Sequence, residues 1–385
     1  MKVLLLNPTI PPRAIPILKD LSREPGIDLM VFFYSISAKN RRWQVNRKTI
    51  KFKYQILKSF DIPFGKNDYI PFTVSFNFLK KLLISKPNVV IAPGWADFPS
   101  YVSAIYCKLF GKKLILRSES TVYEDNWRRK VFMPLTKFMV NCADAYIAAG
   151  TRAKNYLVKL GAKKEKIFVG YSAIDVKLFS LVSKASWAEK VALRKKLGIG
   201  PKDRVVMFNG QLIIRKGVYD LLEAFKKILL SFPNATLLMV GYGMEMLGIE
   251  KYIRDNRLTK KVILTGFVDN KLLPKYYGIS DIFVLPSREE TWGMVINEAM
   301  ASGLPVITGD KVGAGADLIK SGVNGYIFPS GNINKMVTAI EKLLKDRSKR
   351  VRFGMESRRI INSFGIDQLV EAILKSIYSV RQKED

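Results

Sequence analysis

Residues Val284 to Pro305 read VLPSREETWGMVINEAMASGLP and decide the fold of the second half of the chain. A short apolar strand, Asp281 to Leu285, ends at Pro286. After a polar turn, apolar residues recur at helical spacing, at Met294, Val295, Ala299 and Met300. Gly303 fits a left-handed cap at the end of this helix, and Pro305 prevents its continuation. The stretch therefore predicts a strand, a loop and a helix.

Two acids flank the start of this helix. Glu290 lies in the loop, and Glu298 lies about one turn into the helix. Between them the N–H groups of Gly293, Met294 and Val295 form a helix N-terminus, which suits a phosphate group. Hydroxyl partners at both ends and a diphosphate in the middle would fit a nucleotide-sugar. Alternatively, Glu290 only pairs with the helix dipole and Glu298 is a solvated surface residue.

The spacing from Glu290 to Glu298, followed by EAMASGLPVI, resembles the E-x7-E signature of retaining glycosyltransferases of family 4. The resemblance implies an α/β chain of the GT-B fold, in which two Rossmann-like domains with parallel sheets face each other across a donor cleft. It also implies that Glu298 holds the ribose hydroxyls, that Glu290 holds the sugar hydroxyls, and that the anomeric configuration is retained.

Length and composition favour two folded domains. With 385 residues, of which 48% are hydrophobic, the chain is able to bury two cores and is not a disordered protein. The net charge of +31 is uneven, because residues 1–180 contain 31 Lys and Arg but only 12 Asp and Glu. This basicity predicts a polyanionic partner, namely anionic lipid headgroups, phosphorylated ligands or nucleic acid.

Several classes of site and location are excluded or disfavoured. The sequence has no histidine, which excludes Ser-His and Cys-His nucleophiles, histidine-ligated metals and imidazole bases. Cys107 and Cys142 lie in apolar segments and are interpreted as buried thiols in a reducing compartment rather than a disulfide. The apolar run in Met1 to Ile10 is too short for a signal peptide or a membrane span. We therefore expect a cytoplasmic protein, unless a partner anchors it.

Short apolar strands alternate with amphipathic helices along the chain, which predicts parallel, doubly wound sheets. We expect strands at residues 2–7, 28–34, 88–92, 113–117, 145–148 and 167–171, and then at 204–209, 235–240, 261–265, 281–285 and 306–308. A polar stretch places the domain boundary near Val182. The predicted domains are 1–182 on the acceptor side and 183–363 for the nucleotide-sugar. The resemblance implies that the last segment, 364–385, is a helix that crosses back to the first domain.

A basic segment in the first domain suits an anionic membrane surface. Residues Lys39 to Lys58 contain eight Lys or Arg and no acid, interleaved with Trp43, Phe52 and Tyr54. A second cluster begins with Arg128, Arg129 and Lys130 and continues with the apolar residues Val131, Phe132, Leu135, Phe138 and Met139. The alternative is that both segments are solvated basic loops.

The loop Phe208 to Gly217, FNGQLIIRKG, joins a strand to a helix. Lys216 near the helix start would neutralise a departing diphosphate, and Gly210 and Gly217 would let the backbone approach a ligand closely. A charged helix cap is the alternative. In the family this motif has an arginine where the chain has Gln211, so either Arg215 supplies the missing charge or phosphate binding is weaker.

Two further loops match the positions of the family's nucleotide pocket. Gly241 lies in a Gly-x-Gly that by itself is better interpreted as a plain turn, but its place matches the family's Gly-x-Gly that borders the nucleotide. Phe267 and Val268 follow Gly266, where the family's base pocket lies, and Phe267 either contacts the base or packs in the core. The segment from Gly322 to Pro329 also matches the family and is expected to be a hairpin or turn.

The resemblance is weaker in the first domain. The family often has Gly-Gly after its first strand, where this chain has Pro11, Pro12 and Arg13. In the loop after residue 117, where many members have a histidine, the candidate acid is Glu119. It either contacts the sugar or the acceptor, or pairs with Arg117.

Together these features predict a retaining glycosyltransferase that moves a sugar from a nucleotide-diphosphate sugar to a glycan or lipid-linked acceptor, such as one used in polysaccharide synthesis. No Asp-x-Asp occurs, so no metal and no cofactor are expected. The predicted location is cytoplasmic and peripheral on the inner membrane face. The alternatives are a sugar-nucleotide epimerase or phosphorylase of the same fold, a basic nucleic-acid-binding protein, or a non-catalytic membrane-bound protein. We expect no specific nucleic acid partner, because no recognised binding motif occurs.

Overall fold

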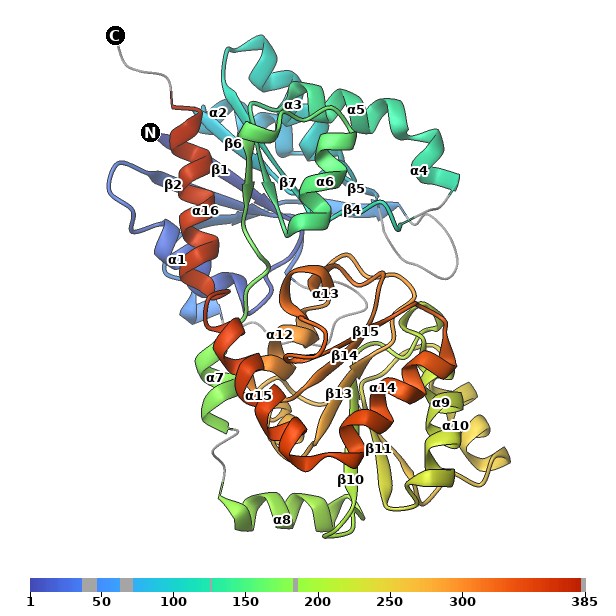
Figure 1. Cartoon of the computed structure of the whole chain (residues 1–385). Helices are drawn as coiled ribbons and strands as arrows, with labels where there is room; N and C mark the ends of the chain where they lie inside the picture. The colour runs from blue at the N-terminus through green and yellow to red at the C-terminus, as the bar shows by residue number, and fades with distance from the viewer. Residues whose placement is uncertain (37–46, 63–71, 125–126, 183–185, 382–385) are drawn as a thin grey trace. The chain divides into compact units, whose positions relative to one another are not determined.

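The computed structural model describes residues 1–36, 47–62, 72–124, 127–182 and 186–381 (Figure 1). The chain forms two compact units, residues 1–172 with 366–385 and residues 173–365. The first unit ends earlier than the boundary expected near Val182. The reason is that helix α7 (Val176–Val182) packs against α11 (Leu273–Gly278) and α12 (Met294–Ala301) of the second unit, where the rings of Phe179 and Tyr277 lie 5.8 Å apart.

The first unit is built on a parallel sheet of seven strands, in the order β3-β2-β1-β6-β7-β8-β9. The strands are β1 (Lys2–Asn7), β2 (Asp28–Phe33), β3 (Lys53–Ile56), β6 (Val89–Ala92), β7 (Lys113–Ser118), β8 (Ala145–Ala148) and β9 (Ile167–Val169). All but β3 were predicted, because buried parallel strands appear as apolar runs. The edge strand β3 and the separate antiparallel pair β4 (Ser59–Ile62) and β5 (Phe72–Ser75) mix polar and apolar residues and were missed.

Two layers of helices cover this sheet. On one face, α2 (Phe78–Ser85), α3 (Phe98–Leu109), α5 (Met133–Cys142) and α6 (Thr151–Lys159) enclose one hydrophobic cluster, and the short α4 (Trp127–Val131) precedes α5. On the other face, α1 (Ala14–Leu21) and α16 (Ile366–Ser379) enclose a second cluster, to which α16 contributes Ile373 and Ile377. The last helix of the chain thus packs beside the first one (Figure 1). Cys107 and Cys142 are buried free thiols, as predicted.

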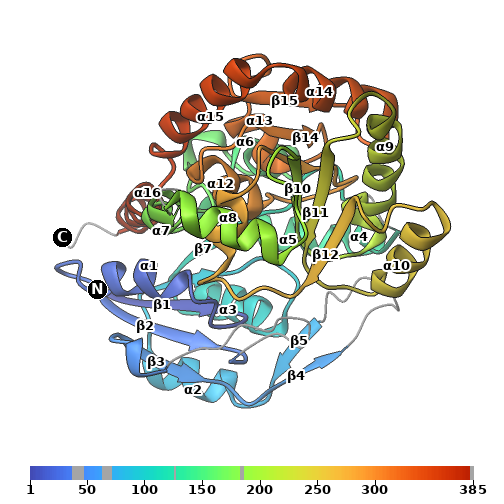
Figure 2. The same ribbon diagram turned by 90° about the horizontal axis from the view of Figure 1, so that it is seen from below.

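The second unit is built on a parallel sheet of six strands, in the order β12-β11-β10-β13-β14-β15 (Figure 2). The strands are β10 (Arg204–Asn209), β11 (Ala235–Val240), β12 (Val262–Gly266), β13 (Ile282–Leu285), β14 (Val306–Gly309) and β15 (Gly325–Phe328). Of the hairpin or turn expected at residues 322–329, the turn exists at residues 322–324, but the hairpin is wrong, because β15 pairs in parallel with β14. The helices are α7, α8 (Trp187–Lys196), α9 (Val218–Ser231), α10 (Met246–Asp255), α11, α12, α13 (Gly313–Leu318), α14 (Ile333–Lys345) and α15 (Arg347–Ile361).

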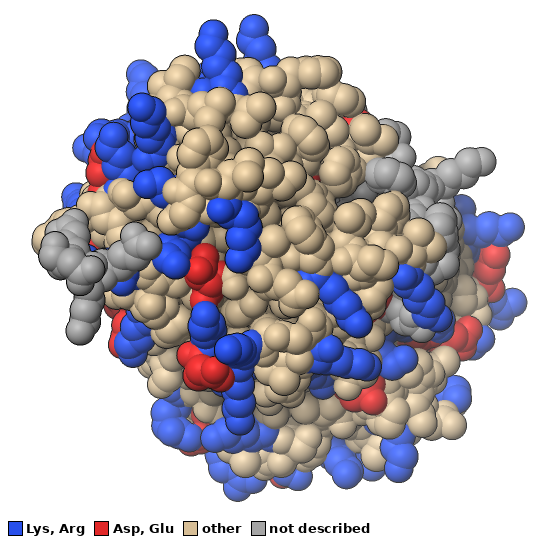
Figure 3. Space-filling model, turned by 90° about the horizontal axis from the view of Figure 1, so that it is seen from above, with Lys and Arg blue, Asp and Glu red and all other residues tan. Residues whose placement is uncertain are grey.

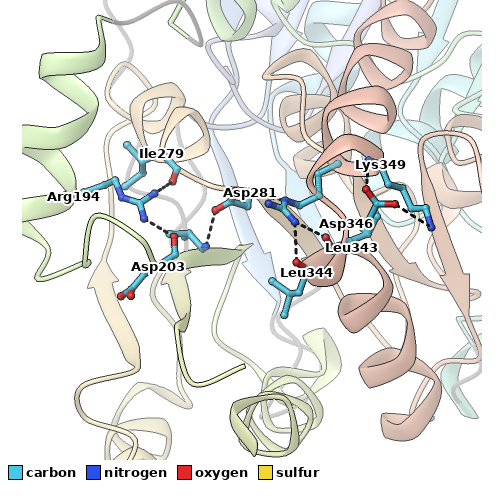
Figure 4. Close-up of polar contacts among 10 residues, drawn as sticks. Arg194, Asp203, Ile279, Asp281, Leu343, Leu344, Asp346 and Lys349 are labelled. Atoms are coloured by element: carbon cyan, nitrogen blue, oxygen red, sulfur yellow. Dashed lines mark hydrogen bonds and ion pairs between the residues drawn. The ribbon is translucent and has the colours of Figure 1, made fainter. Parts of the chain in front are cut away.

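At the amino ends of β10 and β13, two arginines hold loops and helix ends together (Figure 4). Arg194 donates to the carbonyl oxygens of Ile279, at 3.1 Å, and Asp203, at 2.6 Å. Arg350 donates to the last carbonyls of α14, those of Leu343 and Leu344, at 2.6 and 3.0 Å. Its Nε also lies 3.7 Å from a carboxylate oxygen of Asp281, whose other oxygen accepts from the Val205 N–H at 2.9 Å. This end of the sheet is therefore fixed by arginine contacts, many of them to the main chain.

In the part of the chain that the structure describes, no helix is both long and apolar enough to cross a bilayer.

Candidate functional site

The site residues predicted in the second unit lie in the loops that follow four neighbouring parallel strands, or at the start of helix α12. Gly210 and Gln211 follow β10, Gly241 follows β11, Phe267 and Val268 follow β12, and Glu290, Gly293, Met294, Val295 and Glu298 follow β13. Arg215 and Lys216 lie in the one-turn helix η3 (Ile214–Lys216), just before α9. Since the carboxyl ends of parallel strands share one edge of a sheet, these loops meet on one side of the unit.

Lys216 and Glu290, the two predicted catalytic residues of this unit, form an ion pair. A backbone hydrogen bond connects the two loops that carry them, because the Arg288 N–H donates to the Arg215 carbonyl at 2.9 Å. The Arg215 guanidinium donates to the Glu289 carbonyl at 3.1 Å. The exposed fractions of the Lys216 and Glu290 side chains are 12% and 13%, which leaves part of each open to solvent. The structure thus brings together a cation and an acid that are 74 residues apart in sequence.

Glu298 is held by a buried tyrosine and an asparagine. The Tyr277 hydroxyl donates to Oε2 of Glu298 at 2.8 Å, and Nδ2 of Asn209 lies 3.3 Å from the same oxygen. Asn209 also donates to the tyrosine oxygen at 2.9 Å. Burial, and secondly the charge of Glu298, raise the pKa of Tyr277 far above its ordinary value, so the hydroxyl keeps its proton. Sequence analysis missed Tyr277 and Asn209.

Helix α12 begins at Met294, with Gly293 as its cap at φ 98°. A side chain on Gly293 would be strained at this φ and would lie 3.1 Å from atoms of both Leu285 and Val312. The first bond within the helix runs from the Ile296 N–H to the Gly293 carbonyl. The N–H groups of residues 293–295 precede that bond, so they have no acceptor within the helix. Gly303, at φ 80°, ends the helix as predicted.

Two glycines of the predicted site are explained by packing between loops. A Cβ on Gly217 would lie 2.3 Å from the carbonyl oxygen of Pro286. A Cβ on Gly241 would lie 1.8 Å from the carbonyl oxygen of Gly210. The close approach expected at Gly217 therefore exists, but the partner is the loop that carries Glu290 and not a ligand. In the same way, Gly241 lets the loops after β10 and β11 lie back to back.

A second ion pair joins α9 to the loop after β13. The Arg288 guanidinium donates to both carboxylate oxygens of Asp220, at 2.8 and 2.7 Å. This contact raises the pKa of Arg288. Because Arg288 lies two residues before Glu290, the pair helps to fix the position of that acid. Neither residue was a sequence candidate, although the run Arg288, Glu289, Glu290 marks a charged loop.

The base-pocket candidates differ in exposure. The exposed fraction of Phe267 is 46%, so it does not pack in the core, and the structure removes that alternative. Val268 is half-buried. Both follow the carboxyl end of β12, beside the loop of Gly241, whose N–H donates to the Gly266 carbonyl at 3.0 Å.

Glu119 lies in the first unit, in the loop after β7, and is exposed. The hydroxyl of Ser172 lies 3.5 Å from one of its carboxylate oxygens. Burial lowers the pKa of Arg117, and the charge of Glu119 opposes this effect. The same unit has a buried acid that sequence analysis missed, Asp97, which accepts a hydrogen bond from the Tyr34 hydroxyl at 2.7 Å. Burial raises the pKa of Asp97 to about 6.

Within the described ranges, no three His, Cys, Asp or Glu side chains come together in a way that could hold a metal ion.

Comparisons with known proteins identify the fold and show a family likeness in the second unit. Residues 189–360, which lie within the second unit, match the model of the glycosyl transferases group 1. An uncharacterized glycosyltransferase of Methanocaldococcus jannaschii is 33% identical over 184 residues, which are 48% of this chain and 46% of that protein. The sulfoquinovosyl transferase SQD2 of Arabidopsis thaliana is 24% identical over 313 residues, 78% of this chain and 58% of that one. The chain spans about half the length of the curated relatives that it matches.

Solved structures match over the whole chain. The Anabaena protein Alr3699/HepE in complex with UDP has a TM-score of 0.79 at 20% identity, over 99% of this chain and all of that one. Sucrose-phosphate synthase of Thermosynechococcus elongatus has a TM-score of 0.75 at 18% identity, over 99% of this chain and all of that one. These likenesses identify the GT-B fold. The second unit thus resembles the glycosyl transferases of group 1 over residues 189–360.

Proposed function

We propose that the protein transfers a sugar from a nucleotide-diphosphate sugar to an acceptor, with retention of the anomeric configuration and without a metal ion. The observation that carries the proposal is the grouping of Lys216, Glu290 and Glu298 around the first turn of α12. The family match supports the reaction class, and the Anabaena structure named for its complex with UDP supports a nucleotide donor.

The proposed chemistry is the cleavage of the bond between the anomeric carbon and the diphosphate. As this bond breaks through an oxocarbenium-like state, negative charge grows on the leaving diphosphate. Lys216, with help from Arg215, and the N–H groups of residues 293–295 would stabilise that charge. The donor's diphosphate would draw Lys216 away from Glu290, which frees the Glu290 carboxylate to accept hydrogen bonds from the sugar.

Glu298 would hold the ribose hydroxyls of the donor. The bonds from Tyr277 and Asn209 to Oε2 orient this carboxylate at the start of α12. Gly210, Gln211, Gly241, Phe267 and Val268 would border the nucleotide. In the first unit, we propose that Glu119 contacts the sugar or the acceptor.

The acceptor would be a glycan or a lipid-linked molecule, reached from an anionic membrane surface. The basic segment Lys39 to Lys58 suggested such a surface, but residues 39–46, including Trp43, lie outside the described residues. The described part does not support a membrane role for its rings. Phe52 is buried, and Tyr54 packs against it and against Phe33, with ring centroids 6.2 and 6.1 Å apart.

Thermal stability with and without a panel of UDP-, GDP- and ADP-sugars tests the donor site. A ligand at a hundred times its dissociation constant adds about 2.7 kcal/mol to the free energy of unfolding, which a melting curve resolves. We expect one nucleotide class to stabilise the chain, and Glu298→Ala to remove that effect. If no nucleotide-sugar stabilises the protein and nucleic acid binds tightly at low salt instead, the basic nucleic-acid-binding alternative holds.

Glu119 requires a separate test, because it lies in the other unit. Glu119→Gln is expected to lower turnover and to leave stabilisation by the donor nucleotide unchanged. The matched control is Glu165→Gln, an exposed acid of the same unit that follows α6. If Glu119→Gln has the turnover of the wild type, Glu119 serves only as a charge partner of Arg117.

A further inference from the structure

The helix layer formed by α2, α3 and α5 in the first unit is apolar on two sides. These helices lie next to one another, since α2 contacts α3 and α3 contacts α5. Their inner sides bury hydrophobic residues against the sheet, such as Leu82, Cys107 and Met139. A helix that covers a sheet is expected to turn a polar side to water. These three helices expose hydrophobic residues instead.

The exposed hydrophobic residues form a stripe on each helix. On α2 they are Leu79, Leu83 and Ile84, and the spacing of four residues places the two leucines on one side. On α3 the same spacing separates Ile105 from Leu109, and on α5 a spacing of three separates Leu135 from Phe138. We call the following eight residues the outer apolar face: Leu79, Leu83, Ile84, Ile105, Leu109, Phe110, Leu135 and Phe138. The exposed fractions of Ile84 and Leu109 are as high as 71% and 75%.

All exposed charges on the three helices are positive. They belong to Lys80, Lys108 and Lys137, one on each helix, and the helices contain no Asp or Glu. Figure 3 shows the molecule from above, where wide uncharged areas are broken by many Lys and Arg and by few acids. The face therefore combines exposed hydrophobic residues with charge of a single sign.

Helix α14 of the second unit shows the usual pattern for comparison. It buries Met336, Ile340 and Leu343 on its inner side, as an amphipathic helix should. Its exposed residues are all polar: Asn334, Lys335, Thr338, Lys342 and Lys345. Other helices of the second unit do expose hydrophobic residues, such as Leu230 on α9 and Val351 and Met355 on α15. What distinguishes α2, α3 and α5 is that three neighbouring helices expose such residues together and contain no acid.

The charge pattern favours one occupant for the outer apolar face. A second copy packed face to face would bring lysines against lysines, which disfavours a dimer. Nucleic acid would gain from the lysines, but six of the eight residues of the face are aliphatic and offer no ring for a base to stack on. An anionic bilayer fits both features, since aliphatic and aromatic groups enter the interface while lysine side chains reach the headgroups.

We propose that α2, α3 and α5 dock on an anionic lipid surface, with the outer apolar face in the interface and Lys80, Lys108 and Lys137 at the headgroups. This proposal deepens the membrane association proposed above and names the surface that makes it. The neighbouring residues Val131 and Phe132, whose exposed fractions are 60% and 43%, extend the same chemistry at the start of α5.

Co-sedimentation of the full chain with vesicles tests the proposal. The vesicles contain phosphatidylcholine alone or with an equal share of phosphatidylglycerol, and no nucleotide is added. One variant combines Lys80→Gln, Lys108→Gln and Lys137→Gln. Its matched control removes the same charge from exposed lysines of the second unit, Lys251→Gln, Lys335→Gln and Lys345→Gln. We expect binding to anionic vesicles to fall about a hundredfold in the first variant, since each lysine near the surface contributes about fivefold.

A second pair of variants tests the apolar contribution. Leu83→Ser, Leu109→Ser and Phe138→Ser together are expected to weaken vesicle binding by about tenfold or more. The matched control changes exposed hydrophobic residues of the second unit, Leu230→Ser, Val351→Ser and Met355→Ser, and is expected to bind as the wild type does. Melting curves establish that each variant is folded.

Four results would overturn the proposal. The first is equal binding of the wild type to neutral and anionic vesicles, and the second is an equal loss of vesicle binding in a variant and its matched control. The third is a wild-type dimer that the serine variant abolishes, and the fourth is binding to nucleic acid in preference to vesicles. The donor proposal is measured separately, as thermal stabilisation by nucleotide-sugars without vesicles. A variant that loses vesicle binding but is still stabilised by the nucleotide-sugar supports both proposals. If the wild type binds vesicles but no nucleotide-sugar, only the proposal of the donor site is contradicted.

Discussion

The two ends of the second unit's sheet use the same kinds of charged residue in different ways. At the amino ends of the strands, Arg194 and Arg350 donate mainly to backbone carbonyls of loops and of the end of α14. At the carboxyl ends, Lys216 pairs with Glu290, and Glu298 accepts from two side chains. A ligand can replace a side-chain partner, but it cannot take the place of a backbone carbonyl without unfolding the helix end. The partner, more than the residue type, therefore separates the structural charges from those that we propose to be functional.

The largest expected effect breaks the amino-end network. Arg350 is buried, with an exposed fraction of 6%, and its loss leaves two carbonyls and part of the Asp281 carboxylate without their donor. Arg350→Ala should lower the free energy of unfolding by about 3–5 kcal/mol. Urea denaturation measures this effect, with the exposed Arg352→Ala on the same helix as a control. A variant as stable as the wild type would show that this end does not depend on the arginine.

The second effect separates function from stability at the carboxyl end. Lys216→Ala should lower turnover by about 10²- to 10³-fold, because it removes one group that stabilises the leaving diphosphate. The free energy of unfolding should fall by less than in Arg350→Ala, because the Glu290 carboxylate that loses its partner is 13% exposed, whereas Arg350 is 6% exposed. Steady-state kinetics and urea denaturation give the two values, and Lys335→Ala is the control. A loss of stability as large as that of Arg350→Ala would make Lys216 a structural residue.

A smaller effect is expected from the tyrosine that holds Glu298. Tyr277→Phe removes one hydrogen bond to the carboxylate while keeping the ring, so the carboxylate loses part of its orientation. We expect the dissociation constant of the donor nucleotide to rise about tenfold, which is about 1.4 kcal/mol. Thermal titration with the nucleotide measures this change, and the neighbouring Tyr276→Phe is the control. Unchanged nucleotide affinity would show that Tyr277 only fills the core.

The smallest effect is expected from the exposed ion pair. The exposed fractions of the Arg288 and Asp220 side chains are 54% and 9%, so solvent screens their contact from the arginine side only. Arg288→Met should change the free energy of unfolding by less than about 1 kcal/mol and should leave the melting temperature almost unchanged. Lys275→Met, which removes the weaker ion pair with Glu189, is a suitable control. A turnover loss as large as that of Lys216→Ala would mean that Arg288 contacts the donor itself.

Most strands were predictable because a parallel strand buried on both faces appears as an apolar run, as in Leu4 to Leu6 or Val205 to Phe208. The strands β3, β4 and β5 were not predictable, because their mixed composition does not mark them as strands. They are strands because of the neighbouring strands with which they pair. The early end of the first unit depends on how α7 packs, which no local pattern encodes.

The candidate site was predictable where its residues occur at a fixed spacing along the sequence. Glu290, Gly293 and Glu298 belong to one contiguous stretch, and Lys216 follows a recognisable loop. Tyr277 and Asn209 were missed because they lie 21 and 89 residues from the acid that they hold. The pattern also did not show that Gly217 and Gly241 face other loops, because a glycine indicates close approach without naming the partner.

The return of α16 to the first unit has a consequence for how the protein is made. The first unit buries Ile373 and Ile377 of this helix, and Gly170 lies so close to α16 that a Cβ there would be 2.9 Å from Leu369. During synthesis all residues of the second unit are therefore made while the first still lacks one of the two helices that cover this face of its sheet. Since domains generally fold as units, we expect the first unit to complete its core last, when α16 docks beside α1.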